Sequence, residues 1–472
     1  MKKNDLIDLA IDDVTLEGSG VGRHEGMAVF VPFTAPGDVI RCRIVKVNKS
    51  YAFGIADTVI SPSSARSDRG CEVYGRCGGC TFRHMSYEEE ARLKEKAVTD
   101  VFRRIGKFSA EDVAEPVIAA SEADRYRNKA QYPVAEAGGR AVCGFYAPRS
   151  HRVIQCDDCL LEPPVFGEIA RRVLSYADSH GIAPYDELGC RGTLRHIYIR
   201  QGRHTGQIMV CLVCREYADL AELAALLRAE FPDIRAVVLS VNPDNTNVIL
   251  GKKFIPFYGD GTIEDIMCGL RIRLSPQSFY QVNTHQAERL YAKACEYASP
   301  EGADVLDLYC GAGTIGLSMA HLARHVTGAE IVPQAVENAI YNAKVNGISN
   351  ADFICADAAK AAERFAREGR TPDVIITDPP RKGCDRLTLD SMVRMRPERI
   401  VMVSCDPSTA ARDCRILADE GYRLDRLCAV DLYPGTPHVE CVVQLSKGDT
   451  DNGSPGKSDA VKAGDFGMIS GY

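Results

Sequence analysis

The feature that most limits the possible folds is a regular alternation of apolar and helical segments beyond residue 285. Apolar segments of strand length recur there between stretches of helical character: ADVLDLYCG (303–311), HVTGAEI (325–331), ADFICAD (351–357), DVIITDPP (373–380) and RIVMVSCDP (399–407). Such alternation predicts parallel βαβ units and a doubly wound α/β sheet. Ligands of these sheets bind at the carboxyl ends of the strands. We therefore expect functional residues just after these segments.

The rest of the chain reads as separate units. Residues 9–60 alternate apolar and polar positions in short runs between glycines, which predicts a small OB-like β-barrel. A mixture of strand and helix patterns between about 125 and 270 predicts a central α+β domain. A chain of 472 residues with 45% hydrophobic content can bury more than one core. We expect a barrel at 1–60, a central domain at 61–280, a catalytic domain at 281–446 and a disordered tail at 447–472. The helix near 87–106 is a candidate for packing on the catalytic domain.

Net charge, hydropathy and cysteine content limit which kinds of protein this chain can be. The formal net charge is −7, opposite to the basic balance of a non-specific RNA coat, although a local basic groove needs only clustered Lys and Arg. The charged amino terminus lacks a secretory pattern, and no apolar run approaches the roughly 18 residues that span a bilayer. We expect a cytoplasmic protein without a membrane partner. Its 19 cysteines should then serve as core residues, catalytic thiols or metal ligands.

Residues of nucleotide-binding type follow four of the apolar segments. DLYCGAGTIG (307–316) closes a strand and opens a helix, where glycines let the backbone approach a nucleotide. Glu330 ends the next strand, in position to accept both ribose hydroxyls, so NAD and S-adenosylmethionine fit equally well. Asp357 follows the third strand, where an adenine amino group would lie. Asp378 opens a rigid DPPR turn after the fourth, of a kind that recurs in enzymes holding a planar base beside a methyl donor, which favours S-adenosylmethionine.

A thiol and a carboxylate stand at the same predicted edge. Cys405 ends the fifth segment in SCDP, and Glu440 begins a later strand after PGTPHV. Each alone reads more simply as a packing cysteine or a solvated carboxylate. Together they suit methylation of uracil at carbon 5: a thiolate that adds to carbon 6 makes carbon 5 nucleophilic, and a base then removes the proton from carbon 5.

Five motifs in this order resemble the RNA (uracil-C5)-methyltransferase family: SFYQVNT (278–284), DLYCGAGTIGL, DPPRKG, SCDP and PGTPHVE. The resemblance implies a Rossmann-like methyltransferase domain that uses S-adenosylmethionine. It implies that Cys405 is the nucleophile and Glu440 the general base. It also implies a set of S-adenosylmethionine contacts, with Asp357 the weakest candidate: Gln281, Tyr309, Gly311, Gly313, Glu330, Asp357 and Asp378.

A cysteine-rich segment precedes the central domain. Cys71, Cys77 and Cys80 place three thiols within ten residues around two glycines. Spacing alone leaves zinc, an iron-sulfur cluster and chance clustering open. The family resemblance implies a [4Fe-4S] cluster with Cys159 as the fourth ligand and Cys156 as the near alternative. A structural or RNA-positioning role is expected, because methyl transfer to uracil requires no electrons.

The barrel and the family resemblance together predict an RNA substrate. The glycine-rich EGSGVGRHEG (17–26) resembles the TRAM domain, which implies RNA binding, with domain packing as the alternative. The basic residues that would help on one face are Arg23, Arg41, Arg43, Lys46 and Lys49. The resemblance implies a monomer that modifies 23S ribosomal RNA, with the T-loop of transfer RNA as the alternative. Two further hypotheses are a NAD-dependent oxidoreductase, prompted by Gly311, Gly313, Gly316 and Glu330, and an iron-sulfur RNA-binding protein without catalysis.

Overall fold

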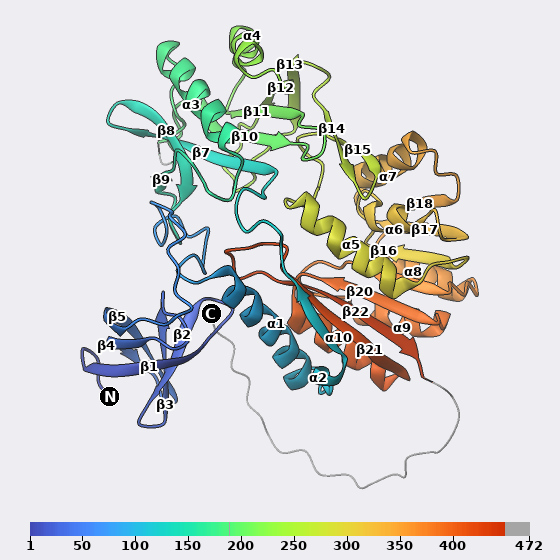
Figure 1. The fold of residues 1–472 in the computed structure, drawn as a ribbon. Coiled ribbons are helices and arrows are strands. Elements are labelled where there is room, and N and C mark those ends of the chain that lie inside the picture. Colours follow the sequence, from blue (N-terminus) through green and yellow to red (C-terminus); the bar gives the residue numbers. More distant parts are fainter. Residues whose placement is uncertain (188, 449–472) are drawn as a thin grey trace.

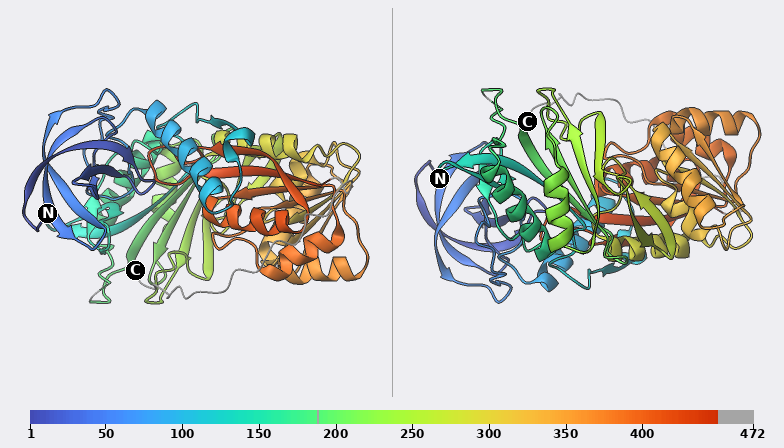
Figure 2. Two further views of the ribbon diagram at one scale, coloured as in Figure 1. Left: turned by 90° about the horizontal axis from the view of Figure 1, so that it is seen from below. Right: turned by 90° about the horizontal axis from the view of Figure 1, so that it is seen from above.

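The computed structural model describes residues 1–187 and 189–448, which form three parts (Figure 1). The amino-terminal strands close into a barrel, a seven-stranded sheet follows, and an eight-stranded sheet dominates the carboxyl-terminal half. In Figure 1 the barrel lies at the lower left, the eight-stranded sheet at the lower right and the seven-stranded sheet above them, and Figure 2 views the same arrangement from below and from above. The tail that we expect to be disordered lies outside the described residues from residue 449 on.

The closed barrel confirms the fold predicted for the amino terminus. Alternate residues of its strands point inward and bury a small apolar core that includes Leu9, Ile11 and Val29. Parallel pairing of β3 with β5 lets the last two strands return beside the first three and close the barrel in the order β1-β2-β3-β5-β4. The strands are β1 (Leu6–Val14), β2 (Ser19–His24), β3 (Met27–Pro32), β4 (Val39–Val47) and β5 (Tyr51–Ser61).

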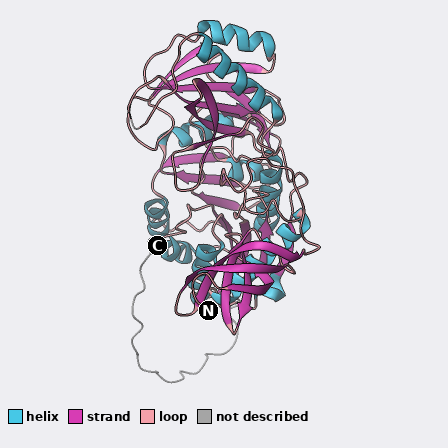
Figure 3. Ribbon diagram, turned by 90° about the vertical axis from the view of Figure 1, so that its left-hand side faces the viewer, coloured by secondary structure: helices cyan, strands magenta, loops and turns pink. Residues whose placement is uncertain are grey.

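The central sheet has the strand order β13-β12-β11-β10-β7-β8-β9 and is antiparallel except for the β11–β12 pair. Helices α3 (Pro164–Ser179) and α4 (Ala221–Glu230) pack on one face of it and share one apolar core with its strands; helices are cyan in Figure 3. Its strands are β7 (Lys129–Ala137), β8 (Arg140–Tyr146), β9 (Val153–Gln155), β10 (Leu194–Gln201), β11 (Ile208–Cys214), β12 (Ile234–Val241) and β13 (Lys253–Tyr258). A separate hairpin, β14 (Ile263–Met267) and β15 (Leu270–Leu274), leads to the catalytic part.

The eight-stranded sheet has the order β18-β17-β16-β19-β20-β22-β21-β6. The five apolar segments predicted as parallel strands form β16 (Asp304–Leu308), β17 (His325–Glu330), β18 (Ala351–Cys355), β19 (Val374–Thr377) and β20 (Arg399–Ser404). Two further strands, β21 (Tyr422–Val430) and β22 (Glu440–Lys447), extend the sheet, and β22 runs antiparallel to β20. Alternate residues point to opposite faces, so Val305 and Leu306 enter different cores.

Helices cover both faces of this sheet. Residues of α5 (Thr284–Ala298) and α6 (Thr314–Met319) fill the core on one face, and α7 (Pro333–Val345) packs near β17 and β18. The opposite core receives α8 (Ala358–Arg367), α9 (Arg386–Met395) and α10 (Pro407–Asp419).

One helix and one strand of the catalytic part come from early in the chain. Helix α1 (Tyr87–Arg104), which Ser86 caps, packs on α10, and after the short helix α2 (Ala110–Val113) strand β6 (Ala114–Ile118) pairs with the edge of β21 (Figure 1). A paired edge strand no longer exposes its backbone groups. The range 61–280 expected for the central domain therefore includes part of the catalytic sheet, because a strand of five residues carries too little periodicity to reveal its partner.

A buried lysine joins α1 to the segment before β22. The side chains of Lys94, Glu90 and Asp431 are all 0% exposed. Lys94 Nζ donates to Glu90 Oε1 at 2.8 Å, to Asp431 Oδ1 at 2.7 Å and to the carbonyl of Tyr433 at 3.2 Å. Glu90 also accepts the backbone N–H of Gly435. Removal of Lys94 would leave buried Asp431 without its cation and Glu90 with Arg69 alone, whose Nη1 lies 3.0 Å from Glu90 Oε2.

We therefore predict that Lys94→Met lowers the free energy of unfolding by about 3–5 kcal/mol, the usual cost of breaking a buried ion pair. Urea denaturation followed by circular dichroism measures the change. The matched control is Arg92→Ala on the same helix, where the side chain is 54% exposed and pairs with Glu89. That variant should cost no more than about 1 kcal/mol. Equal costs for both variants would show that the buried network does not stabilise the fold.

Candidate active site

The predicted site residues collect at the carboxyl ends of the parallel strands. Strand β16 lies between β17 and β19. The strand order therefore changes direction at β16, with β17 and β18 on one side and β19 and β20 on the other. Such a switch point opens a crevice for ligands. Tyr309 follows β16 and Asp378 follows β19, and the two therefore flank the crevice.

The loop after β16 turns on residues in the left-handed region. Tyr309, Gly311 and Gly313 have φ of +65°, +55° and +77°. A Cβ at Gly313 would lie 2.9 Å from the ring of Phe353, so packing requires glycine there. A Cβ at Gly311 would meet nothing within 4 Å. Gly313 is thus explained by the fold, whereas Gly311 exposes its backbone to open space where a ligand can approach.

Glu330 and Asp357 already have partners within the protein. The carboxylate of Glu330 accepts the backbone N–H of Gly311 at 3.1 Å and that of Val332 at 2.9 Å. These bonds fix it beside the glycine loop and leave lone pairs for further donors. Asp357 accepts the backbone N–H of Lys360 at 3.3 Å as the N-cap of α8. A helix cap alone explains an aspartate at that position.

Gln281 lies between β15 and α5 and is 8% exposed. Its carbonyl accepts from Asn128 Nδ2 at 2.8 Å, and its Oε1 accepts from the Tyr433 hydroxyl at 3.2 Å. Asn283 Nδ2 donates to the carbonyl of Leu432 at 3.1 Å. The SFYQVNT segment is therefore attached both to the central sheet and to the segment before Glu440.

Cys405 and Glu440 lie on neighbouring strands, at the same edge of the sheet. In the antiparallel pairing of β20 with β22, Ser404 lies opposite Cys441, so Cys405 and Glu440 form the next pair of positions. Glu440 is 4% exposed, and Cys405 is only partly buried. The register thus places a reachable thiol beside a buried carboxyl group next to the crevice.

Burial changes the protonation of these groups. Burial and, to a smaller extent, Asp378 raise the pKa of Glu440 to about 8, against an opposing effect of Arg381. Burial raises the pKa of Asp378 to about 7. The pKa of Cys405 rises to about 11, mainly through burial and then through Glu440 and Asp378. A carboxyl group with a pKa near neutral pH is suited to accept and release protons.

Arg381, Tyr433 and Tyr291 also belong to the site, the last because Asp378 raises the pKa of its phenol, after burial as the main cause. Arg381 is a cation that favours the charged forms of both Cys405 and Glu440. Cys405 and Glu440 in turn raise the pKa of the Tyr433 phenol, after burial as the main cause. Arg381 is part of the DPPR motif and Tyr433 is part of DLYPGTP, so both residues could have been selected from these motifs. Tyr291 lies within α5, where a buried aromatic reads as core.

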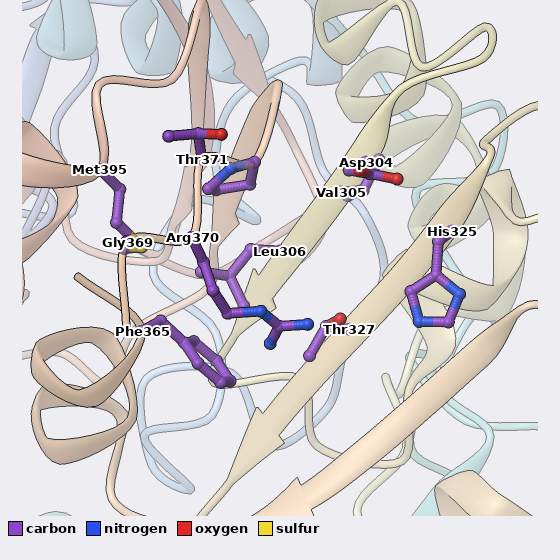
Figure 4. Close-up of a pocket in the computed structure, with 11 residues that line it drawn as sticks. Asp304, Val305, Leu306, His325, Thr327, Phe365, Gly369, Arg370, Thr371 and Met395 are labelled. Atoms are coloured by element: carbon purple, nitrogen blue, oxygen red, sulfur yellow. The ribbon is translucent and has the colours of Figure 1, made fainter. Parts of the chain in front are cut away.

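One cavity lies at the other end of these strands. It measures about 410 Å³ and is lined by the starts of β16 and β17, by the residues before β19, and by Phe365 and Arg370 near the end of α8 (Figure 4). Asp304 and His325 mark the amino ends of their strands. Because ligands of doubly wound sheets bind at the carboxyl ends, this cavity is not the nucleotide crevice.

The cysteine-rich segment packs against the central sheet. Cys71, Cys77 and Cys159 contact one apolar cluster that contains Cys156. Burial raises the pKa of the Cys80 thiol to about 12, and Cys77 and Cys71 contribute to the increase. The backbone N–H of Gly79 donates to Cys77 Sγ at 3.5 Å. Five thiols are thus gathered in one region, which is the donor chemistry of a zinc or iron-sulfur site.

Comparison with known proteins decides the family. Residues 268–448 match the family model for tRNA (uracil-5-)-methyltransferase, and residues 3–56 match the TRAM domain. An uncharacterized RNA methyltransferase of Halalkalibacterium halodurans is 43% identical over 94% of this chain and 98% of its own length. The chain belongs to the RNA (uracil-5-)-methyltransferase family. It is an S-adenosylmethionine-dependent RNA methyltransferase, and the hypothesis of a NAD-dependent oxidoreductase is set aside.

Other relatives agree with this assignment. An uncharacterized RNA methyltransferase of Bacillus cereus is 40% identical over 95% of this methyltransferase and 98% of its own length. Among solved structures, the tRNA (uracil-54, C5)-methyltransferase of Pyrococcus abyssi in complex with S-adenosyl-L-homocysteine is 28% identical. It covers 93% of this chain and 99% of its own, with a TM-score of 0.75. Within residues 1–187 and 189–448, no helix is both long and apolar enough to cross a membrane.

The raised pKa of Glu440 predicts a pH-dependent cost to the fold of the methyltransferase. The stability that a raised carboxyl pKa contributes is complete below the unfolded value of about 4.5 and is lost as pH rises to about 8. Glu440→Gln has no such titration. The free energy of unfolding of the variant should therefore exceed that of the wild type by about 1–3 kcal/mol at pH 9, and this excess should disappear near pH 5.

Urea denaturation of both proteins at pH 5, 7 and 9 measures this difference. Glu368→Gln is the control, because that carboxylate is exposed and pairs with Arg364 on the surface. A difference between wild type and Glu440→Gln that does not change with pH would contradict the burial argument.

Proposed function

We propose that the protein methylates carbon 5 of a uridine in 23S ribosomal RNA through a covalent adduct between Cys405 and carbon 6 of uracil. The observation that carries this proposal is the register of β20 and β22, in which Cys405 and Glu440 are adjacent at the edge of the crevice. The Cys405 thiol loses its proton to solvent as the sulfur adds to carbon 6, and carbon 5 takes the methyl group from S-adenosylmethionine, which leaves as S-adenosylhomocysteine. Glu440 then takes the proton from carbon 5, and the thiolate is eliminated from carbon 6.

The charges around Cys405 fit this order of events. Burial, followed by Glu440 and Asp378, opposes the thiolate and outweighs Arg381, which favours it, so the raised pKa of about 11 keeps the Cys405 thiol protonated in the protein without RNA. The Glu440 carboxyl group has a pKa close to neutral pH and can take up a proton without a large change in free energy. We infer that a uracil placed over Cys405 displaces water and brings carbon 5 within reach of Glu440.

Bound S-adenosylmethionine would supply an electrophilic methyl group beside carbon 5. The residues proposed to hold it are those that surround the switch point. Gly311 offers open space, Glu330 retains free lone pairs beside it, and Gln281 is held in place by Asn128 and Tyr433. We propose the same role for Tyr309, Gly313 and Asp378, and a smaller one for Asp357 because its carboxylate caps α8.

Release of tritium tests the reaction and the nucleophile together. RNA that carries tritium at carbon 5 of its uridines is incubated with the protein and S-adenosylmethionine. We expect tritium in water with the wild type and a loss of at least about a thousandfold in rate with Cys405→Ala, because the covalent route is removed. Glu440→Gln should form the adduct but release little tritium.

Cys190→Ala is the control for this assay, since Cys190 is an exposed cysteine in the β9–β10 connection of the central part. It should release tritium at the wild-type rate. Undiminished release by Cys405→Ala would overturn the assignment of the nucleophile.

Two classes of RNA are candidate substrates. We propose 23S ribosomal RNA, with the T-loop of transfer RNA as the second candidate. The second is favoured by the likeness to the Pyrococcus abyssi enzyme, whose name specifies uracil 54 of tRNA. That likeness spans 93% of this chain, so domain architecture alone does not separate the two substrates. Parallel tritium assays with unmodified ribosomal and transfer RNA decide between them.

We propose that the barrel binds single-stranded RNA by stacking. Phe30, Tyr51 and Phe53 form one ring cluster, with centroids 5.5–5.9 Å apart, and Tyr51 and Phe53 are each 37% exposed. Base stacking on exposed aromatic rings is independent of sequence. Of the basic residues expected to assist, Arg41 and Arg43 pair with Asp8 and Asp57, which reduces their attraction for phosphate.

We further propose that Cys71, Cys77, Cys80 and Cys159 hold a [4Fe-4S] cluster. These thiols suit a metal cluster because burial raises the pKa of both Cys80 and Cys159. Their thiolates are therefore stable only beside a positive group, such as the iron of a cluster. Gly78, with φ of +70°, allows the chain to wrap between Cys77 and Cys80. A cluster at this place would tie the segment 71–80 to the central sheet.

Iron analysis tests the four ligands. After anaerobic purification we expect about four iron atoms per chain in the wild type and in Cys190→Ser, as one cluster of this type requires. Cys80→Ser and Cys159→Ser should lose most of the iron. Cys156→Ser distinguishes the alternative fourth ligand and should retain it. Zinc in place of iron in the wild type would contradict the cluster.

A further inference from the structure

Three side chains of metal-binding type converge where the central sheet meets α5. His204 lies in the turn between β10 and β11, and His285 and Glu288 lie near the start of α5. His204 Nε2 is 3.0 Å from Glu288 Oε1, and His285 Nδ1 is 3.9 Å from Glu288 Oε2. One possible ligand atom from each residue lies within 4.8 Å of the other two. The cluster therefore joins two regions that are distant in the sequence.

The backbone holds each of these residues in place. The fully buried carboxylate of Asp265 accepts the N–H groups of Arg203 and His204, each at 2.9 Å. A Cβ at Gly202 would lie 2.7 Å from the carbonyl oxygen of Glu264, so the turn that carries His204 lies tightly against β14. The backbone N–H of Cys268 donates to Glu288 Oε1 at 2.9 Å. Little chain entropy is left to be lost when an ion binds.

The imidazole rings are arranged for a shared ligand rather than for stacking. Their centroids are 5.0 Å apart with an interplanar angle of 87°. The exposed fractions of the side chains are 32% for His204, 44% for His285 and 24% for Glu288, so an ion can reach them from solvent. Two imidazoles and one carboxylate are a donor set that Zn²⁺ accepts, with water in the fourth position.

We propose that His204, His285 and Glu288 bind one Zn²⁺ ion and thereby link the β10–β11 turn to helix α5. Zinc ligands lie about 2.0–2.2 Å from the ion, so small side-chain rotations bring the three atoms to it. The link bears on the active site because α5 directly follows Gln281 and is capped by Asn283. The ion holds the position of α5 against the central sheet and takes no part in methyl transfer.

Zinc titration of the full-length protein, purified anaerobically with its cysteine site occupied, tests this proposal. Isothermal titration calorimetry with ZnCl₂ compares the wild type with His285→Gln, Glu288→Gln and the control His321→Gln, which changes an exposed histidine that follows α6. Any zinc taken up by thiols is common to all four proteins. We expect one site in the wild type and the control whose affinity falls by at least about tenfold in the two other variants.

Thermal unfolding provides the second measurement. An ion that binds only the folded protein raises Tm by mass action, so ZnCl₂ should raise the Tm of the wild type and of His321→Gln but not that of His285→Gln. Equal zinc affinity in all four proteins would overturn the site. A site that is lost in His285→Gln but whose occupation leaves the wild-type Tm unchanged would overturn its role as a link.

Discussion

The side chain of Lys94 is buried between Glu90 and Asp431, and the position of Glu440, the proposed general base, depends on it. Asp431 begins the segment that ends at Glu440, and the same lysine donates to the carbonyl of Tyr433 within that segment. Two carboxylates brought together out of water repel each other strongly, and Lys94 between them, together with Arg69 at 3.0 Å from Glu90, offsets that repulsion. A charged group distant in sequence thereby stabilises the segment that leads to Glu440, the proposed base.

Residues from several distant stretches of the chain contact this one segment. The backbone N–H of Thr81, next to the cysteine-rich segment, donates to the carbonyl of Gly435, and the Tyr126 hydroxyl donates to that of Pro434 at 3.0 Å. Asn283 and Tyr433 connect it to the SFYQVNT segment. Thr81 directly follows Cys80 of the proposed cluster, and Asn283 lies just before His285 of the proposed zinc site. In this account both act by positioning, which agrees with a reaction that requires no electrons.

The parallel strands could be predicted because each is a short, mainly apolar segment between helical patterns, and its carboxyl end carries a motif. The barrel was predictable for a similar reason, since alternation of apolar residues survives in a small closed sheet. By contrast, β6 has five residues and only its pairing with β21 makes it part of the catalytic sheet. The buried network of Lys94 could not be predicted either, because a lysine in a charged helix reads as a solvated residue. Asp357 shows a different difficulty. An aspartate that caps a helix and an aspartate that contacts a ligand give the same sequence pattern, so the pattern alone does not distinguish the two roles.

The central claim is that Cys405 forms a covalent bond to carbon 6 while Glu440 removes the proton from carbon 5. RNA that contains 5-fluorouridine tests it most directly, because fluorine at carbon 5 cannot leave as a proton and the adduct should persist. The account predicts a denaturation-resistant complex of protein and RNA that forms only with S-adenosylmethionine present, and mass spectrometry should place the modified base on the peptide that contains Cys405. An adduct on another cysteine, or no adduct with an RNA that the enzyme methylates, would contradict the account.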